Sequence, residues 1–233
     1  MVGTDKANKM IQYVYWSIQI MNYLVFLTLD ISKSYPLTSS RVKYASIILC
    51  FLYAIYSKKK ERSAYILAGL FFTVISDYFL LFTKDFAWGM LSFCVTQTMY
   101  SIYCSKDKRQ FLIKEVIQIC AIGGIMLVLP QVVFIKIDIV IIVSAYYFIH
   151  LLSNVLFSWI CSKEGRYRKL FAIGMTLFLL CDIHVAMYNA GSYLNVSSSH
   201  VYQKIYEVAT VAMWFYYLPS QVLIAMVGRK NLI

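Results

Sequence analysis

The sequence predicts an all-α membrane protein with eight transmembrane helices, and three observations lead to this prediction. The 233 residues are 61% hydrophobic and 14% charged, whereas soluble domains are about 25% charged. The apolar residues form long unbroken runs, which favours helices over the alternating pattern of a β-barrel. The basic residues gather between alternate runs, as the positive-inside rule expects.

Each predicted span is an apolar run that approaches the roughly 20 residues needed to cross about 30 Å of hydrocarbon. The first run has no signal-peptide cleavage site behind it, so we expect it to be a span. The second and fourth runs are the shortest. The third and seventh each contain an aspartate, and the fourth and eighth each contain a glutamine. In order, the runs are about 11–29, 42–57, 65–83, 88–104, 115–135, 137–161, 170–189 and 206–226.

The basic residues predict the orientation of the chain. Most of the 22 Lys and Arg residues, including those in 58–62, 106–114 and 163–169, fall on the side that holds the N-terminus. This places both termini in the cytosol and agrees with an even number of spans. Such charges orient a membrane protein and contact anionic lipid, so we expect a bilayer and not nucleic acid as the partner. We expect one transmembrane domain over residues 1–233, in an integral multi-pass protein of the endoplasmic reticulum or of a bacterial inner membrane.

The two halves of the chain, residues 1–110 and 111–233, resemble each other. "AGLFFTVISDYF" in the third run parallels "AIGMTLFLLCDIH" in the seventh, and "FCVTQ" in the fourth parallels "YLPSQ" in the eighth. A four-helix unit repeated in tandem would relate the halves by an axis along the membrane normal. Chance similarity between apolar segments is the alternative explanation.

Asp77 and Asp182 are the first candidates for chemistry, because an ionisable residue inside a membrane span is functional by default. Each lies about 12 residues into its run, which places both at a similar depth in the bilayer. Burial and a nearby carboxylate both disfavour the charged form, so one of a pair can stay protonated and act as an acid while the other accepts. The alternative is structural: each aspartate caps a helix, bonds Ser76 or Thr73, or pairs with a cation.

Four further side chains are candidates for binding the substrate or orienting a water. Gln97 and Tyr100 share one helix face, and Tyr217 and Gln221 share another. Hydrogen bonds between helices are the structural alternative for each of them.

No metal or other cofactor is expected. The histidines are far apart in the sequence, no HxxxH or HExxH occurs, and a zinc site needs about three ligands. We expect His150 and His184 to be packed or bonded to water. The pair Gly123–Gly124 is predicted to pack two helices together.

Several short blocks resemble the YhhN-type lysoplasmalogenase family. "CDIHVA" and "YYLPSQVLIA" resemble its second and closing blocks, and "YPLTSS" resembles its Lys-Pro-Leu segment. The first block is matched by Asp77, Leu80, Phe86, Gly89, Phe93 and Tyr100. The sequence departs from the family where Gln97 replaces a His, Ser76 a Gly, Cys181 a Ser and Tyr35 a Lys.

The resemblance implies an eight-helix hydrolase that needs no metal and cleaves the vinyl-ether bond of single-chain lysoplasmalogens. It also implies that Asp77 and Asp182 are the catalytic residues. The chemistry suits an acid/base pair, since the alkene carbon must be protonated and a carboxylate must then stabilise the cation and activate water. A transporter or lipid-handling protein that uses the same buried acids is the alternative function.

Overall fold

The protein is an all-α bundle. The computed structural model describes residues 2–57, 63–83, 85–105, 107–133, 139–193 and 200–227, and within these ranges it holds eight α-helices, one 3₁₀-helix and no strand. The all-α prediction is therefore confirmed for this part of the chain. The helices are α1 (Val2–Ile31), α2 (Pro36–Ser57), α3 (Ser63–Phe82), α4 (Phe86–Cys104), α5 (Lys108–Val133), α6 (Ile139–Cys161), α7 (Arg166–Tyr193) and α8 (His200–Met226), with the 3₁₀-helix at Ser162–Glu164.

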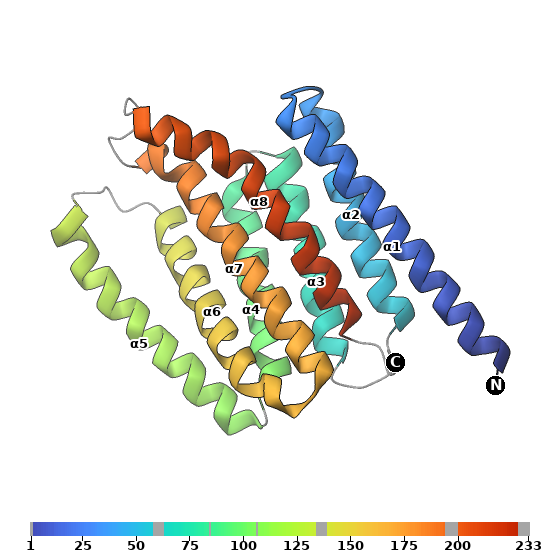
Figure 1. Ribbon diagram of the computed structural model, residues 1–233. Coiled ribbons are helices and arrows are strands. Elements are labelled where there is room, and N and C mark those ends of the chain that lie inside the picture. The colour runs from blue at the N-terminus through green and yellow to red at the C-terminus, as the bar shows by residue number, and fades with distance from the viewer. Residues whose placement is uncertain are drawn as a thin grey trace.

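Successive helices run up and down through the bundle. In Figure 1, α1 and α5 form its two edges, and the remaining helices lie between them. The closest packing joins α7 to α8 and α3 to α4, while α4 also packs on α6 and α2 on α8. The two ends of the described chain lie at the same end of the bundle (Figure 1), as an even number of up-and-down helices requires.

Five of the eight helices are long and apolar enough to cross a membrane. They contain the segments Lys9–Ile31, Ser63–Phe82, Ile141–Cys161, Arg166–Ser192 and His200–Met226. The helices α2, α4 and α5 are not among the five. Their composition explains the difference, because α2 opens with polar residues and carries Arg41 and Lys43, α5 begins with Lys108 and Arg109, and α4 contains a series of Ser, Thr and Gln residues.

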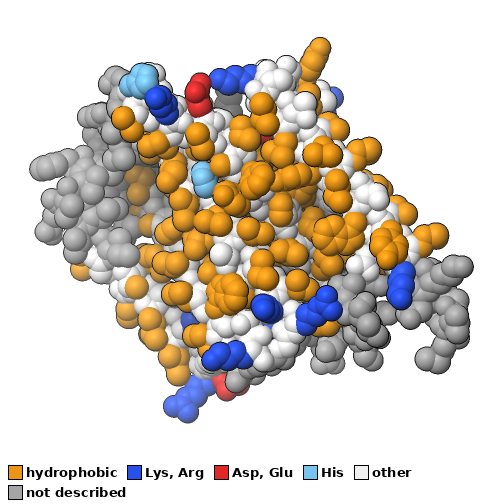
Figure 2. All heavy atoms as spheres, in the orientation of Figure 1, with side chains coloured by type: hydrophobic (Ala, Val, Ile, Leu, Met, Phe, Trp, Pro, Cys, Tyr) orange, Lys and Arg blue, Asp and Glu red, His pale blue; other side chains and the backbone are white. Residues whose placement is uncertain are grey.

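The surface has the character expected of a membrane protein. Hydrophobic side chains cover the middle of the face shown in Figure 2, and the Lys and Arg side chains lie towards its ends. Large apolar residues such as Leu24 on α1 and Phe215 on α8 are 60% and 49% exposed. Contact with lipid tails is the environment in which such exposure costs little.

Two glycines bring helix pairs into close contact. A Cβ at Gly69 would lie 2.2 Å from Cε1 of Tyr100, and a Cβ at Gly174 would lie 2.9 Å from Cγ1 of Ile224. Each glycine stands eight residues before the aspartate of its own helix, and each contacted residue stands three residues after a glutamine. The α3–α4 and α7–α8 pairs therefore pack through equivalent positions.

The predicted packing role of Gly123 and Gly124 was wrong for the part of the chain that the structure describes. No described atom lies within 4 Å of a Cβ placed at either position of α5. The reason is the place of α5 at the edge of the bundle, where its main contact is with α6.

A buried ion pair fixes the opposite edge of the bundle. The Nζ of Lys43 on α2 lies 2.7 Å from Oδ2 of Asp30 on α1. The same Nζ lies 4.8 Å from the ring centroid of Trp214 on α8. A cation held both by a carboxylate and by an aromatic face is strongly localised, so these contacts tie α1 and α2 to α8.

Candidate functional site

Asp77 is buried in the middle of α3 and bonded to α8. Asp77 is only 3% exposed. The hydroxyl of Tyr217 donates to both carboxyl oxygens, with O···O distances of 2.9 Å to Oδ1 and 2.8 Å to Oδ2. This joins one predicted catalytic residue to one predicted binding residue from the other half of the chain.

Asp77 is not bonded to Ser76 or Thr73 and is not paired with a cation in the described part of the chain, as the structural alternative would require. The hydroxyl of Ser76 donates to the backbone oxygen of Gly89 at 2.6 Å, and that of Thr73 donates to the backbone oxygen of Gly69 at 3.0 Å. No ion pair among the described residues includes Asp77 or Asp182. Asp77 therefore has neither of the two neighbouring hydroxyls nor a cation as its partner.

Asp182 has a matching tyrosine partner that sequence reasoning missed. It lies on α7, is half-buried, and accepts a short hydrogen bond at Oδ2 from the hydroxyl of Tyr147 on α6. Tyr147 itself is 4% exposed. In a chain with 20 tyrosines, nothing in the sequence marks this one, because the contact depends on how α6 packs against α7.

An aromatic cluster joins the two aspartate–tyrosine pairs. The rings of Phe93 and Tyr147 have centroids 5.6 Å apart, those of Phe93 and Phe178 also 5.6 Å, and those of Phe178 and Tyr217 5.5 Å. Tyr147 bonds Asp182 at one end of this cluster, and Tyr217 bonds Asp77 at the other. The aspartates that the sequence predicts to converge thus lie in one region of the core.

Several buried polar groups near this region have no hydrogen-bond partner in the described part of the chain. They are Nε2 of Gln97, Oη of Tyr100, Oγ of Ser220 and both amide atoms of Gln221. All four residues are fully buried. Buried polar groups are normally paired with protein or water, so these atoms are candidates to bind a water or a ligand.

The histidines take the structural roles expected of them. His184 places Nδ1 2.7 Å from the backbone oxygen of Leu180 and stacks on Tyr216, with ring centroids 5.4 Å apart. His150 is fully buried and lies 3.2 Å from Oε1 of Glu115 through its Nε2.

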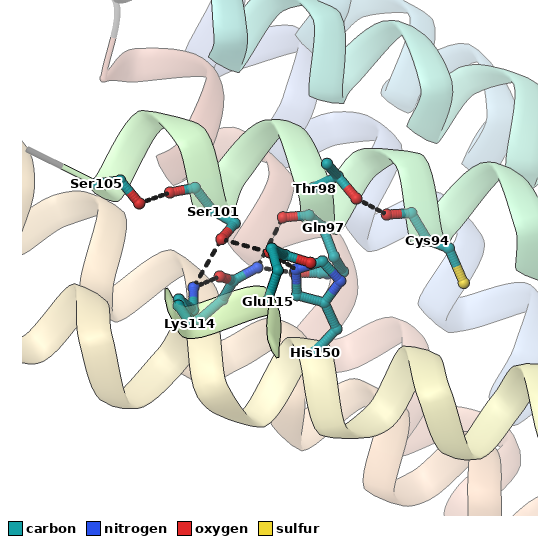
Figure 3. A network of polar contacts seen from close by, with 9 residues as sticks. Cys94, Gln97, Thr98, Ser101, Ser105, Lys114, Glu115 and His150 are labelled. Carbon is teal, nitrogen blue, oxygen red and sulfur yellow. Dashed lines mark hydrogen bonds and ion pairs between the residues drawn. The ribbon is translucent and has the colours of Figure 1, made fainter. Parts of the chain in front are cut away.

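A second, partly buried polar network lies between α4, α5 and α6, and the sequence analysis did not predict it. Figure 3 shows Lys114, Glu115 and His150 against the α4 residues Gln97 and Ser101. In the sequence, Lys114 and Glu115 are ordinary basic and acidic residues at the edge of an apolar run. Only the contacts of α5 with α4 and α6 show that both side chains are partly buried.

Two surface hollows in the described part of the chain lie away from the aspartates. One, of about 560 Å³, lies along Lys204, Val208 and Phe215 of α8, and the other, of about 280 Å³, lies beside Tyr188 and Tyr202. The rings of the aromatic cluster link Tyr147 to Tyr217, the two tyrosines that bond the aspartates.

Comparison with known proteins gives one match. The model of the YhhN family matches residues 38–227, a range that starts in α2 and includes both aspartates and both glutamines of the site. No curated protein and no solved structure matches the chain.

Proposed function

We propose that the chain, which belongs to the YhhN family of lysoplasmalogenases, hydrolyses the vinyl-ether bond of a lysoplasmalogen to an aldehyde and a glycerophospho-alcohol. The substrate is a single-chain lysophospholipid that reaches the protein through the bilayer. The observation that supports this proposal best is the pair of aspartates, each bonded by a tyrosine hydroxyl, at the two ends of one aromatic cluster.

The reaction begins when a protonated aspartate transfers its proton to the outer carbon of the vinyl ether. The electron pair of the double bond forms the new C–H bond, and the ether oxygen shares the positive charge that remains. The second aspartate, as a carboxylate, stabilises this oxocarbenium ion and takes a proton from the attacking water. As the C–O bond of the resulting hemiacetal breaks, the second aspartate gives its proton to the departing oxygen and the first takes the proton of the hemiacetal hydroxyl, which releases the alcohol and the aldehyde and restores both aspartates.

The different burial of the two aspartates supports a division of roles. A carboxylate cut off from water loses solvation that the neutral acid does not need. Asp77, the more deeply buried, is therefore the proton donor in this proposal. Asp182 is half-buried and is the carboxylate, and the hydroxyl of Tyr147 supports its negative charge.

The unpaired polar groups supply a place for the water and for the polar part of the lipid. Nε2 of Gln97 and Oη of Tyr100 on α4, and both amide atoms of Gln221 on α8 one turn from Tyr217, are buried and have no hydrogen-bond partner in the described part of the chain. In this proposal they bind the attacking water and the glycerol oxygens of the substrate.

The proposal includes a topology of eight spans with both termini in the cytosol, in the endoplasmic reticulum of a eukaryote or the inner membrane of a bacterium. The described chain begins and ends at the same end of the bundle, which supports an even number of spans. The equivalent packing of Gly69 on Tyr100 and of Gly174 on Ile224 supports a four-helix unit repeated in tandem.

Release of aldehyde from lysoplasmenylcholine or lysoplasmenylethanolamine by the purified protein tests this function. We expect Asp77→Asn and Asp182→Asn each to lower the rate by about 10²–10⁴-fold, the usual range for a lost general acid or base. Asp85→Asn is the matched control, because Asp85 is exposed and its side chain makes no capping bond. No aldehyde from the wild-type protein contradicts the hydrolase proposal and leaves transport by the same acids as the function to test.

A further inference from the structure

A chain of directed hydrogen bonds runs from α5 through α6 to Gln97 on α4. The Nζ of Lys114 donates to Oδ1 of Asn154, through a short bond, and to Oγ of Ser101 at 2.9 Å. The Nδ2 of Asn154 donates to the backbone oxygen of Gln97 at 2.8 Å and to its Oε1 at 2.9 Å. Asn154 thereby uses both of its amide hydrogens and its oxygen, and it is fully buried.

The order of donors and acceptors in this chain leaves only one arrangement. A lysine ammonium has three donors and no acceptor, so it must face the oxygen of Asn154 and not its amide nitrogen. The nitrogen of Asn154 then faces Gln97 and must meet the oxygen of that amide. The remaining group of Gln97 is Nε2, a donor, and it is buried without a partner among the described residues.

The contacts around Lys114 hold its ammonium group in place. Ser101, which accepts from Lys114, donates its own hydrogen to Oε1 of Glu115 at 3.1 Å. Glu115 in turn pairs with His150. The ring centroid of Phe157 lies 5.3 Å from Nζ of Lys114. Figure 3 shows Lys114, Ser101, Glu115 and His150 around Gln97. Gln97 lies one turn along α4 from Phe93 of the aromatic cluster.

We infer that Lys114 and Asn154 are positioning residues that make Gln97 a hydrogen-bond donor to an oxygen atom bound in the core. Two sources of that oxygen are a hydroxyl or ether oxygen of the lysolipid and the attacking water. The inference rests on the proposed function for the identity of the lipid. It assigns a role to α5, which no aspartate or tyrosine of the site contacts in the described structure.

Asn154→Asp tests the inference, because it replaces only the side-chain NH2 group with an oxygen. A carboxylate at 154 still accepts from Lys114, but it offers Gln97 an acceptor, so Gln97 must turn and present Oε1 to the core. We expect kcat/KM for aldehyde release to fall about tenfold in Asn154→Asp. We expect about the same fall in Gln97→Met, since both variants remove one donated hydrogen bond. The double variant is expected to be no worse than Gln97→Met alone, because both changes remove the same contact.

Two measurements separate the sources of the oxygen. If the oxygen belongs to the lipid, the Kd of a saturated alkyl-ether lysophospholipid, which cannot be cleaved, rises about tenfold in both variants, as does KM. If it belongs to the water, this Kd stays at the wild-type value while kcat for aldehyde release falls. Asn189→Asp is the matched control, because Asn189 is an exposed residue of α7 whose side chain donates to the Val185 oxygen of its own helix.

The results distinguish the failure of this inference from that of the proposed function. Additive losses in the double variant, or wild-type values of both Kd and kcat in Asn154→Asp, overturn the inference while leaving the hydrolase intact. A wild-type protein that releases no aldehyde overturns the hydrolase proposal. In that case a rise of Kd in both variants still supports the inference, and an unchanged Kd overturns it. Lys114→Met, which leaves Asn154 free to turn, gives the same non-additive pattern with Gln97→Met and replaces Asn154→Asp if that variant does not fold.

Discussion

At the scale of single residues, two tyrosine hydroxyls give the two aspartates different surroundings. The hydroxyl of Tyr217 is shared between both oxygens of Asp77, whereas that of Tyr147 bonds one oxygen of Asp182. A hydroxyl that donates to a carboxyl group also fixes its rotation. Tyr217 therefore holds Asp77 through both of its oxygens, whereas Tyr147 holds Asp182 through Oδ2 alone.

Tyr217→Phe is expected to weaken both activity and stability. It leaves the buried carboxyl group of Asp77 without its donor, which costs about 1–3 kcal/mol, and we expect aldehyde release to fall about tenfold or more. Thermal unfolding in detergent and the rate of release measure the two effects. Tyr216→Phe is the control, because the neighbouring Tyr216 uses its ring to stack on His184; an equal loss in this variant would contradict the role of the Tyr217 hydroxyl.

The aspartates and the glutamines could be predicted from the sequence, but the residues that hold them could not. A carboxylate or an amide inside an apolar run is conspicuous because it is costly there. Tyr147 and Asn154 are ordinary residues of α6 in the sequence, and they acquire roles only from the rotation of α6 against α4 and α7. Lys114 looked like a flanking charge because its burial depends on a neighbouring helix.

At the scale of helices, the positions of the eight elements were predicted and several of their ends were not. The predicted spans began at about residues 11, 42 and 206, whereas α1, α2 and α8 begin at Val2, Pro36 and His200. An apolar run reports only the part of a helix that lies in hydrocarbon. The helix itself continues for one or more turns into the polar region, where the hydropathy pattern ends.

The glycine contacts between helices give a prediction at this scale. Gly69→Ala places a methyl group 2.2 Å from the ring of Tyr100, and we expect the strain to cost about 1–3 kcal/mol of stability. Gly174→Ala, against Ile224, is expected to behave in the same way with a smaller loss. Gly123→Ala on α5 meets no described atom within 4 Å and is the control. Thermal unfolding of the three variants measures the difference, and a Gly69→Ala protein as stable as Gly123→Ala would show that α3 and α4 can separate at no cost.

At the scale of the whole molecule, the up-and-down order of the helices fixes which loops share a side. The two ends of the described chain lie at one end of the bundle, and the bias of Lys and Arg in the sequence predicts that this end faces the cytosol. The end of α7 and the start of α8 lie at the opposite end of the bundle.

Epitope tags at the two termini are therefore expected to be accessible from the cytosolic side only. A tag inserted within 194–199, which contains the sequon Asn195–Val196–Ser197, is expected to be accessible from the other side only. Protease protection in sealed vesicles measures both. In a secretory membrane, Asn195→Gln would also remove a glycan from the protein. Tags that report opposite sides for the two termini would refute the eight-span order.

The aromatic cluster between the aspartates has a kinetic consequence. The rings of Phe93 and Phe178 link the two tyrosines that bond the aspartates, so under the proposed function the incoming lipid is expected to displace them before the alkene carbon meets the acid. The rate at which these two rings change rotamer is then expected to set an upper limit on how fast a chain can be admitted.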